Sequence, residues 1–278
     1  MGSNYNLDFK DLFIVGWKAI ARYEIGTSHL NQGIPCQDYG HYRLFKDDVI
    51  VGAVADGAGS AKYADVGSKL AVETVLELFD DVNESPDKQG ETDRKLSQPL
   101  SKLEVEKLFA EIVNLVFTEL SKKASEEHYS VNELACTLLV FIATPNWLAA
   151  MQIGDGFIVL RSKNSEEYQL LFHPDKGEFA NETTFITSEN VLHEMQVDVI
   201  LGEQEFICAS TDGLEKVAIR FQDWKAFSPF FKPFEEYLKL TSNPEEEAEY
   251  VINFLNSERL NTRTDDDKTL LLCRWERE

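Results

Sequence analysis

The hydrophobic pattern in the middle of the chain has the period of β-strands, and it constrains the fold more than any other feature. Strands are predicted at CTLLVFIAT (136–144), NWLAAMQIG (146–154), GFIVLRS (156–162), EYQLLF (167–172) and EFICAS (205–210). They follow one another without intervening helices, whereas a parallel βαβ protein would alternate the two. The order therefore predicts an α+β sandwich of antiparallel sheets with helices outside.

Further elements are predicted on both sides of this run. Helical spacing of apolar residues is found at 64–79, 102–124 and 245–257, the last beside an aromatic-rich helical region. Strand patterns occur within 14–29, at 49–56 and at 268–275. The polar segment 81–101 is predicted to be an exposed connection, and HPDKGEFANETTFITSEN (173–190) a surface flap. We expect the whole chain, 1–278, to form a single domain.

The composition narrows the classes of function. A net charge of -22 disfavours nucleic acids and anionic membranes as partners, because both would repel the chain. No window approaches eighteen uninterrupted apolar residues, and MGSNYNLDFK at the start lacks the pattern of a signal peptide, so we expect a soluble cytoplasmic protein. The four cysteines have no C-x-x-C spacing, which indicates reduced thiols.

Four aspartates stand at the ends of predicted strands. Asp56 follows GAVA, Asp155 follows MQIG, Asp212 follows ICAST, and Asp266 precedes the last strand. A single Asp next to Gly usually makes a turn or caps a helix. If neighbouring strands bring all four to one rim, their repulsion and desolvation would raise their pKa values unless a cation neutralises them.

Hard divalent cations suit such a rim. Mg²⁺ and Mn²⁺ prefer oxygen ligands, and no cluster of His or Cys accompanies the acids to indicate Zn²⁺. Gly57 and Gly59 lack a Cβ, so the chain there would approach an ion closely. The rival interpretation of DGAGS (56–60) is a phosphate-binding loop, but neither a following Lys-Ser or Lys-Thr nor G-x-G-x-x-G supports a nucleotide fold.

Five motifs in order resemble those of the metal-dependent protein Ser/Thr phosphatases of type 2C, in a divergent bacterial branch: GTSHLNQGIPCQDYG, VADGAGS, MQIGDGF, ASTDGL and DDDKT. The resemblance spans most of the chain, from about Gly26 to Leu272. It implies an αββα sandwich with a two-metal centre at one end. Residue by residue, it implies carboxylate ligands at Asp38, Asp56, Asp212 and Asp266, with Asp56 bridging and Gly57 offering its carbonyl. Asp265 and Asp267 are the register alternatives to Asp266.

The chain departs from the family's pattern near two of these motifs. Gln37 precedes Asp38 where the family usually has Glu, which removes a charge beside the metals. His29 lies near the place where many members hold the substrate phosphate with an Arg. His29 would bind phosphate or protonate the leaving alkoxide, and the alternative is a structural or exposed histidine.

The resemblance supports a third metal site less well than the first two. Asp155, in Gly154-Asp155-Gly156, matches the acid of that site. Lys216 stands four residues after Asp212, where an acid often completes it. Two ions, Mn²⁺ or Mg²⁺, are therefore expected.

The resemblance implies one-step hydrolysis of phosphomonoesters by a water between the two metals. Its substrates would be phosphoserine and phosphothreonine proteins in signalling, with a cognate kinase as a possible partner and residues 176–190 bordering the cleft. Cys36 lacks the C-x5-R cradle of cysteine phosphatases, which argues against a nucleophilic role.

Two other functions stay open at this point. Gln37 and Lys216 keep alive a catalytically weak, phosphatase-like module that binds or senses a partner. The retained acids count against it, because a scaffold has little physical need for them. A small-molecule phosphoesterase would share the chemistry and differ in its pocket.

Overall fold

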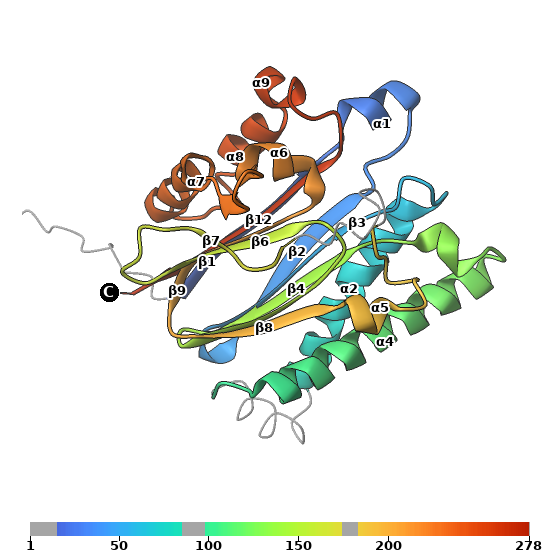
Figure 1. Cartoon of the computed structure of the whole chain (residues 1–278), viewed down its shortest axis with the longest axis horizontal. Coiled ribbons are helices and arrows are strands. Elements are labelled where there is room, and N and C mark those ends of the chain that lie inside the picture. Colours follow the sequence, from blue (N-terminus) through green and yellow to red (C-terminus); the bar gives the residue numbers. More distant parts are fainter. Residues whose placement is uncertain (1–15, 85–97, 174–182, 278) are drawn as a thin grey trace, which may run out of the picture.

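Two five-stranded antiparallel sheets lie face to face, and helices cover the outer face of each (Figure 1). The computed structural model describes residues 16–84, 98–173 and 183–277. The strand orders are β1-β12-β9-β6-β7 and β2-β3-β4-β5-β8. This αββα arrangement confirms the fold class predicted from the sequence.

The second sheet is covered by helices on one face and by the first sheet on the other. Its strands are β2 (Asp38–Phe45), β3 (Val49–Asp56), β4 (Leu138–Ala143), β5 (Trp147–Ile153) and β8 (Gln196–Leu201). Every residue of β4 and β5 is buried. Strands buried on both faces have near-continuous apolar sequences, as these two do.

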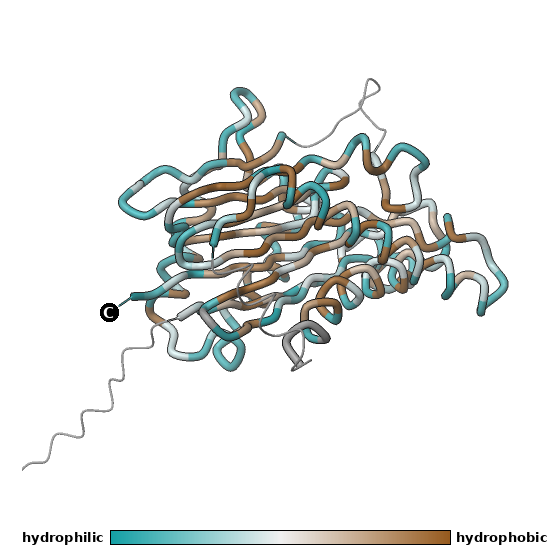
Figure 2. Tube along the Cα trace, turned by 90° about the horizontal axis from the view of Figure 1, so that it is seen from below, coloured by the Kyte–Doolittle hydropathy of each residue, from teal (hydrophilic) through white to brown (hydrophobic). Residues whose placement is uncertain are grey.

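Helices α2 (Ala64–Glu84) and α4 (Lys102–Glu126) cover this sheet. Their buried apolar faces and those of β3, β4 and β5 form one core cluster. Ser101 and Glu104 start α4 with a reciprocal capping box. Figure 2 shows brown, apolar stretches running along the strands and along the helical faces that meet them.

The first sheet consists of β1 (Gly16–Glu24), β12 (Lys268–Glu276), β9 (Gln204–Ser210), β6 (Phe157–Ser162) and the short β7 (Gln169–Leu170). Its outer face carries α6 (Glu215–Ala218), α7 (Ser228–Leu240), α8 (Glu249–Leu255) and α9 (Glu258–Asn261). Buried phenylalanines of α7 pack on β6 and β9: Phe230, Phe231 and Phe234. A third apolar cluster fills the space between the two sheets.

Several boundaries differ from the predicted ones. Helix α2 continues to Glu84, so residues 81–84 are helical and not part of an exposed connection. Residues 85–97 and 174–182, in the predicted connection and flap, lie outside the described residues. Strands β2 and β8 and the short hairpin of β10 (Ile219–Arg220) and β11 (Lys225–Ala226) were not predicted. Both missed strands lie at sheet edges, where half-exposed polar residues interrupt the apolar pattern.

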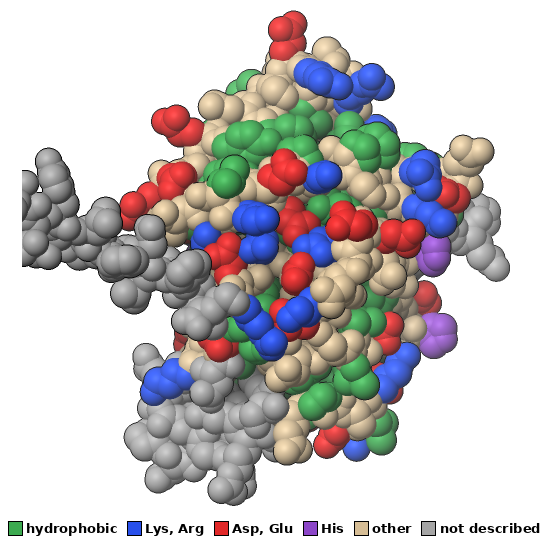
Figure 3. All heavy atoms as spheres, turned by 90° about the vertical axis from the view of Figure 1, so that its left-hand side faces the viewer, with side chains coloured by type: hydrophobic (Ala, Val, Ile, Leu, Met, Phe, Trp, Pro, Cys, Tyr) green, Lys and Arg blue, Asp and Glu red, His purple; other side chains and the backbone are tan. Residues whose placement is uncertain are grey.

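The surface charges are mixed locally. Figure 3 shows one end of the molecule, where Lys and Arg side chains lie among Asp and Glu. Examples are the ion pairs of Lys18 with Glu276 and of Arg161 with Glu205. Among the described residues, no helix is both long enough and apolar enough to cross a membrane.

Candidate functional site

Five aspartates that are distant in sequence converge at one end of the two sheets. Asp38 begins β2 and Asp56 ends β3, and the antiparallel register places them directly opposite each other. The other three flank strands of the same sandwich: Asp155 in the β5–β6 turn, Asp212 after β9 and Asp266 before β12. Burial raises the pKa of Asp56, and the charges of Asp38, Asp212, Asp266 and Asp155 raise it further. The five side chains therefore form one electrostatic unit, which we call the acid cluster.

The cluster lies where ionised carboxylates are costly. Asp38 is buried, and desolvation raises its pKa well above the usual range. Burial, followed by the charges of Asp155, Asp266 and Glu215, raises the pKa of Asp212 to about 7. A bound cation would remove this cost, because it stabilises the ionised forms.

Hydroxyl groups hold Asp38 in place. Its Oδ2 accepts hydrogen bonds from Thr211 Oγ1 at 2.6 Å and from Thr269 Oγ1 at 2.9 Å. Thr211 follows β9 and Thr269 belongs to β12, so both donors come from the first sheet while Asp38 belongs to the second. The carboxylate thereby joins the two sheets at the site.

The turn that carries Asp155 is fixed from two sides. Gln152 Nε2 donates to the carbonyl oxygens of Gly154 and Gly156, at 3.2 and 2.9 Å. Thr183 Oγ1 donates to Asp155 Oδ2 at 2.7 Å. Thr183 belongs to the predicted flap, so this part of the flap reaches the acid cluster.

The later part of the flap is packed against the protein. Ile186 is fully buried, and its N–H donates to the Cys136 carbonyl at 2.8 Å. Phe185 packs against Ala58, Ala61 and neighbouring alanines. These residues therefore do not form a solvated loop.

A close approach of two turns brings Asp212 next to Asp266. A Cβ on Gly213 would lie 1.8 Å from the Asp267 carbonyl oxygen, so any side chain there would push the turns apart. The small size of Gly57 also serves packing within the fold. A Cβ there would lie 2.6 Å from Ala64 Cβ, so its small size serves the packing of α2. A Cβ on Gly59 would meet no described atom within 4 Å, so nothing near it requires a glycine.

The contacts of the 265–267 turn distinguish the three consecutive aspartates. Asp267 is buried and both of its oxygens accept hydrogen bonds from N–H groups, which leaves it poorly suited to a metal. Asp266 acts electrostatically on Asp56 and Asp212. Asp265 and Asp266 are both exposed, and the Asp265 carbonyl accepts from Ser28 N at 2.9 Å. This geometry favours Asp266 as the member of the cluster.

Glu215 is an acid at the site that the sequence analysis missed. It is buried at the start of α6, and its charge raises the pKa of Asp212. Lys216, the residue at the spacing where an acid was sought, is exposed. The sequence carries a signal for this residue, because Glu215 is an acid three residues after Asp212 and one position before Lys216.

His29 and Cys36 flank the cluster on the segment between β1 and β2. His29 lies on α1 (Thr27–Gln32), and its Nδ1 is 2.9 Å from Asp267 Oδ2. Cys36 is half-buried, and burial followed by the charges of Asp38 and Asp267 raises its thiol pKa. A protonated thiol is a poor nucleophile, which agrees with the sequence argument. All four cysteines are free.

The donor set of the cluster fits a hard divalent cation. All five acids offer carboxylate oxygens, and the buried Gln37 Oε1 beside Asp38 has no hydrogen-bond partner among the described residues, which a metal-bound water would supply. As the side chains stand, no three or more His, Cys, Asp or Glu side chains in residues 16–84, 98–173 and 183–277 are arranged to hold a metal ion. A cation that binds the cluster would draw the carboxylates together, because it neutralises their mutual repulsion.

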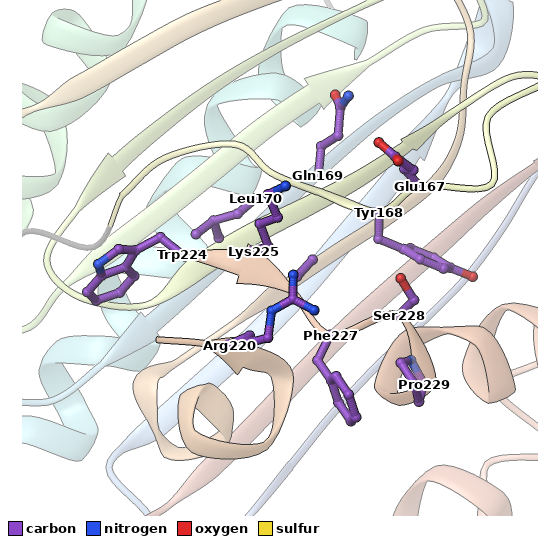
Figure 4. A pocket seen from close by; sticks show the side chains of 11 residues that line it. Glu167, Tyr168, Gln169, Leu170, Arg220, Trp224, Lys225, Phe227, Ser228 and Pro229 are labelled. Atoms are coloured by element: carbon purple, nitrogen blue, oxygen red, sulfur yellow. The ribbon is translucent and has the colours of Figure 1, made fainter. Parts of the chain in front are cut away.

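A hollow of about 660 Å³ lies apart from these acids, beside the β10–β11 hairpin and β7 (Figure 4). Its lining includes Tyr168, Arg220, Trp224 and Lys225, and none of the acid cluster. Arg220 is already paired with Asp223 through two hydrogen bonds of 2.6 Å. The acid cluster is therefore the better candidate for phosphate chemistry.

Known proteins are similar to this chain in both sequence and fold. Residues 25–253 match the family model described as protein phosphatase 2C. The serine/threonine-protein phosphatase 3 of Escherichia coli (strain K12) is 31% identical over 270 residues, which cover 94% of this chain and 99% of that protein. A serine/threonine phosphatase structure from S. agalactiae aligns with a TM-score of 0.60 at 17% identity, covering 94% of this chain and all of that one. The catalytic domain of the phosphatase PstP, in complex with two manganese ions, aligns with a TM-score of 0.58 at 16% identity, covering 94% and 99%.

Proposed function

Because the chain belongs to the protein phosphatase 2C family, we propose that it hydrolyses phosphoserine and phosphothreonine monoesters in proteins, with two divalent cations at the acid cluster. One observation carries the proposal. Asp38 and Asp56 of one sheet and Asp212 and Asp266 of the other meet at one end of the sandwich, where their charges act on one another. A site with this much uncompensated acid is suited to metal-assisted hydrolysis.

We assign the metal ligands from this arrangement. Asp56 would bridge the two ions, with Asp38, Asp212 and Asp266 as further carboxylates and the Gly57 carbonyl as a neutral donor. Asp155 and Glu215 are the acids for a third, weaker site. Mn²⁺ or Mg²⁺ is favoured by the oxygen donors and by the manganese in the PstP complex. When bound, the metals lower the pKa of a water and neutralise the phosphoryl oxygens.

The surrounding residues would orient the reaction. Thr211 and Thr269 hold Asp38, and Gln152 holds the turn of Asp155, so the acids keep fixed positions while substrate binds. His29, at the edge of the cluster, would bind the phosphate or protonate the leaving alkoxide. Thr183 brings the flap segment to the rim, where residues 176–190 would contact the substrate protein.

The net charge and the free thiols bear on the substrates, partners and location of the protein. The net charge of -22 favours substrates with basic residues around the phosphorylated side chain. It also disfavours nucleic acids and anionic membranes as partners. A cytoplasmic location suits four free thiols, and a Ser/Thr kinase acting on the same substrates would be the cognate partner in signalling.

The test is hydrolysis of p-nitrophenyl phosphate and of a phosphoserine peptide with Mn²⁺, with Mg²⁺ or with EDTA. We expect turnover with either metal and none with EDTA. Asp56→Asn should lower kcat by at least about a thousandfold, because the bridging carboxylate is lost. Asp65→Asn on α2 is the matched control and should leave kcat unchanged. Turnover that survives EDTA, or an active Asp56→Asn variant, would reject the proposal.

A further inference from the structure

One buried carboxylate beside the acid cluster makes three hydrogen bonds to a single segment of chain. Asp267 Oδ1 accepts from Gly26 N at 2.6 Å, and Oδ2 accepts from Gln37 N at 2.6 Å. The third bond joins Oδ2 to His29 Nδ1 at 2.9 Å. Asp267 has a relative exposure of 2%, so these bonds are not exchanged for bonds to bulk water.

Two of the three bonds are sufficient to anchor the segment. Gly26 precedes α1 and Gln37 precedes β2, so Asp267 fixes residues 26–37 at both ends. The Ser28 N–H adds a bond to the Asp265 carbonyl at 2.9 Å. The bond to the His29 ring adds little to this anchoring. It instead fixes one side chain, whose position beside Asp266 places it at the edge of the cluster.

We propose that Asp267 is a positioning residue for His29, holding the ring through Nδ1 so that Nε2 faces the leaving oxygen of the substrate. A carboxylate that accepts from Nδ1–H fixes both the tautomer and the rotation of the ring. The His29 side chain is 17% exposed, which allows a substrate to reach it. This inference rests on the proposed phosphatase function and gives one of its residues a defined orientation.

The proton transfer runs from His29 to the serine oxygen. An incoming water oxygen forms a P–O bond as the bond from phosphorus to the serine oxygen breaks, and both protons of that water stay on the product, dihydrogen phosphate. Nε2–H gives its proton to that serine oxygen, and His29 keeps its second proton on Nδ1 against Asp267. The Asp267 carboxylate keeps its bonds to Gly26 N and Gln37 N, so it stays in place beside the ring while the proton moves. General acid catalysis of this kind contributes about 10²–10⁴-fold.

Two substrates whose leaving groups differ in basicity distinguish a positioning role of Asp267 from a purely structural one. A serine alkoxide needs a proton to leave, whereas p-nitrophenolate leaves without one. We expect Asp267→Asn to lower kcat for a phosphoserine peptide by about 10²-fold while kcat for p-nitrophenyl phosphate falls less than about threefold. The Asn amide would present a donor where an acceptor is needed for Nδ1–H. Asp265→Asn, on the exposed neighbour in the same turn, should change neither value.

A double-mutant cycle tests whether Asp267 acts through His29. His29→Asn retains an N–H near the position of Nδ1 but has no Nε2. It should show the same selective loss as Asp267→Asn, and the double variant should be no worse than either single one. Additive losses, or equal losses on both substrates in Asp267→Asn, would overturn the inference while leaving the phosphatase function intact. A wild-type protein that hydrolyses neither substrate with Mn²⁺ would instead overturn the proposed function, and this inference with it.

A measurement on the unmodified protein covers the case in which Asp267→Asn does not fold. Long-range ¹H–¹⁵N NMR at pH 8.5 reports the tautomer of each of the five histidines, and His29→Asn identifies the His29 signals. We expect His29 in the Nδ1–H form. A neutral His29 with its proton on Nε2 would contradict the proposal.

Discussion

Asp38 and Asp56 are direct cross-strand partners, at the first residue of β2 and the last residue of β3. Like charges opposite each other in an antiparallel pair are destabilising, and burial adds a desolvation cost to both. Thr211 and Thr269 offset part of this cost for Asp38 by donating hydrogen bonds. The pair therefore costs the fold stability when no cation neutralises it.

Thr211→Val removes a donor from Asp38 without a large change in volume. We expect Mn²⁺ affinity to fall about tenfold, because residues that orient metal ligands typically contribute 10–100-fold. Thr211→Ser keeps the hydroxyl and should retain affinity. Isothermal titration of both variants measures the effect. Equal affinities for the Val and Ser variants would show that the hydroxyl does not orient Asp38.

Asp266→Asn should abolish metal-dependent turnover, whereas Asp265→Asn should leave it within about twofold of the wild type. Asp265 and Asp266 are both exposed, but it is the charge of Asp266 that raises the pKa of Asp56 and of Asp212. Because the reaction would depend on the bound metals, loss of a carboxylate ligand should lower the rate strongly. Kinetics with p-nitrophenyl phosphate and Mn²⁺ separate the two variants, and the reverse ranking would move the ligand by one residue.

Gly213→Ala should destabilise the protein by roughly 3 kcal/mol, because the added Cβ overlaps the Asp267 carbonyl oxygen and backbone atoms must move. It should also lower activity, since the turn that carries Asp212 is displaced. Gly59→Ala meets no neighbour and should change neither property. Urea denaturation with and without Mn²⁺ gives both free energies of unfolding. A neutral Gly213→Ala would contradict the close packing of these turns.

The metal-free protein should lose stability as pH rises. The pKa of Asp212 is about 7 in the folded state, against about 3.9 in the unfolded chain, so the folded state binds more protons between these values. The free energy of unfolding in EDTA should therefore fall from about pH 4, near the unfolded pKa, to about pH 8, just above the folded pKa of Asp212. For this group the fall is at most about 4 kcal/mol.

Mn²⁺ should remove most of this pH dependence, because it neutralises the ionised carboxylates. Asp212→Asn in EDTA should show a shallower fall than the wild type, since one titrating group is gone. Urea midpoints at pH 5, 6, 7 and 8 provide the measurement. A metal-free protein that becomes more stable from pH 5 to pH 8 would contradict the desolvation of the cluster.

The extent to which the sequence predicted the fold depends on how each element is buried. Strands β4 and β5 are covered on both faces, and their apolar runs identified them. β2 is an edge strand with half-exposed polar residues, and His41 and Arg43 obscured its pattern. Helix α1 has six residues, none of them buried, and therefore no apolar face to recognise.

The residues of the site divide in the same way: local motifs identify some of them, and others depend on contacts between distant segments. Local motifs identified Asp56, Asp155 and Asp212, because each sits beside glycine at the end of an apolar strand. The structural use of Asp267 was not predictable, since its partners Gly26 and Gln37 lie 241 and 230 residues away in sequence. Glu215 was missed because burial, which gives it its importance, is a property of the folded chain.

The interior position of β12 in the first sheet has a consequence for biosynthesis. This strand pairs with β1 on one side and β9 on the other, and Asp266 and Asp267 immediately precede it. During synthesis, β1 therefore has no partner strand in this sheet until β12 has been made, and the segment 26–37 has no Asp267 to bind it.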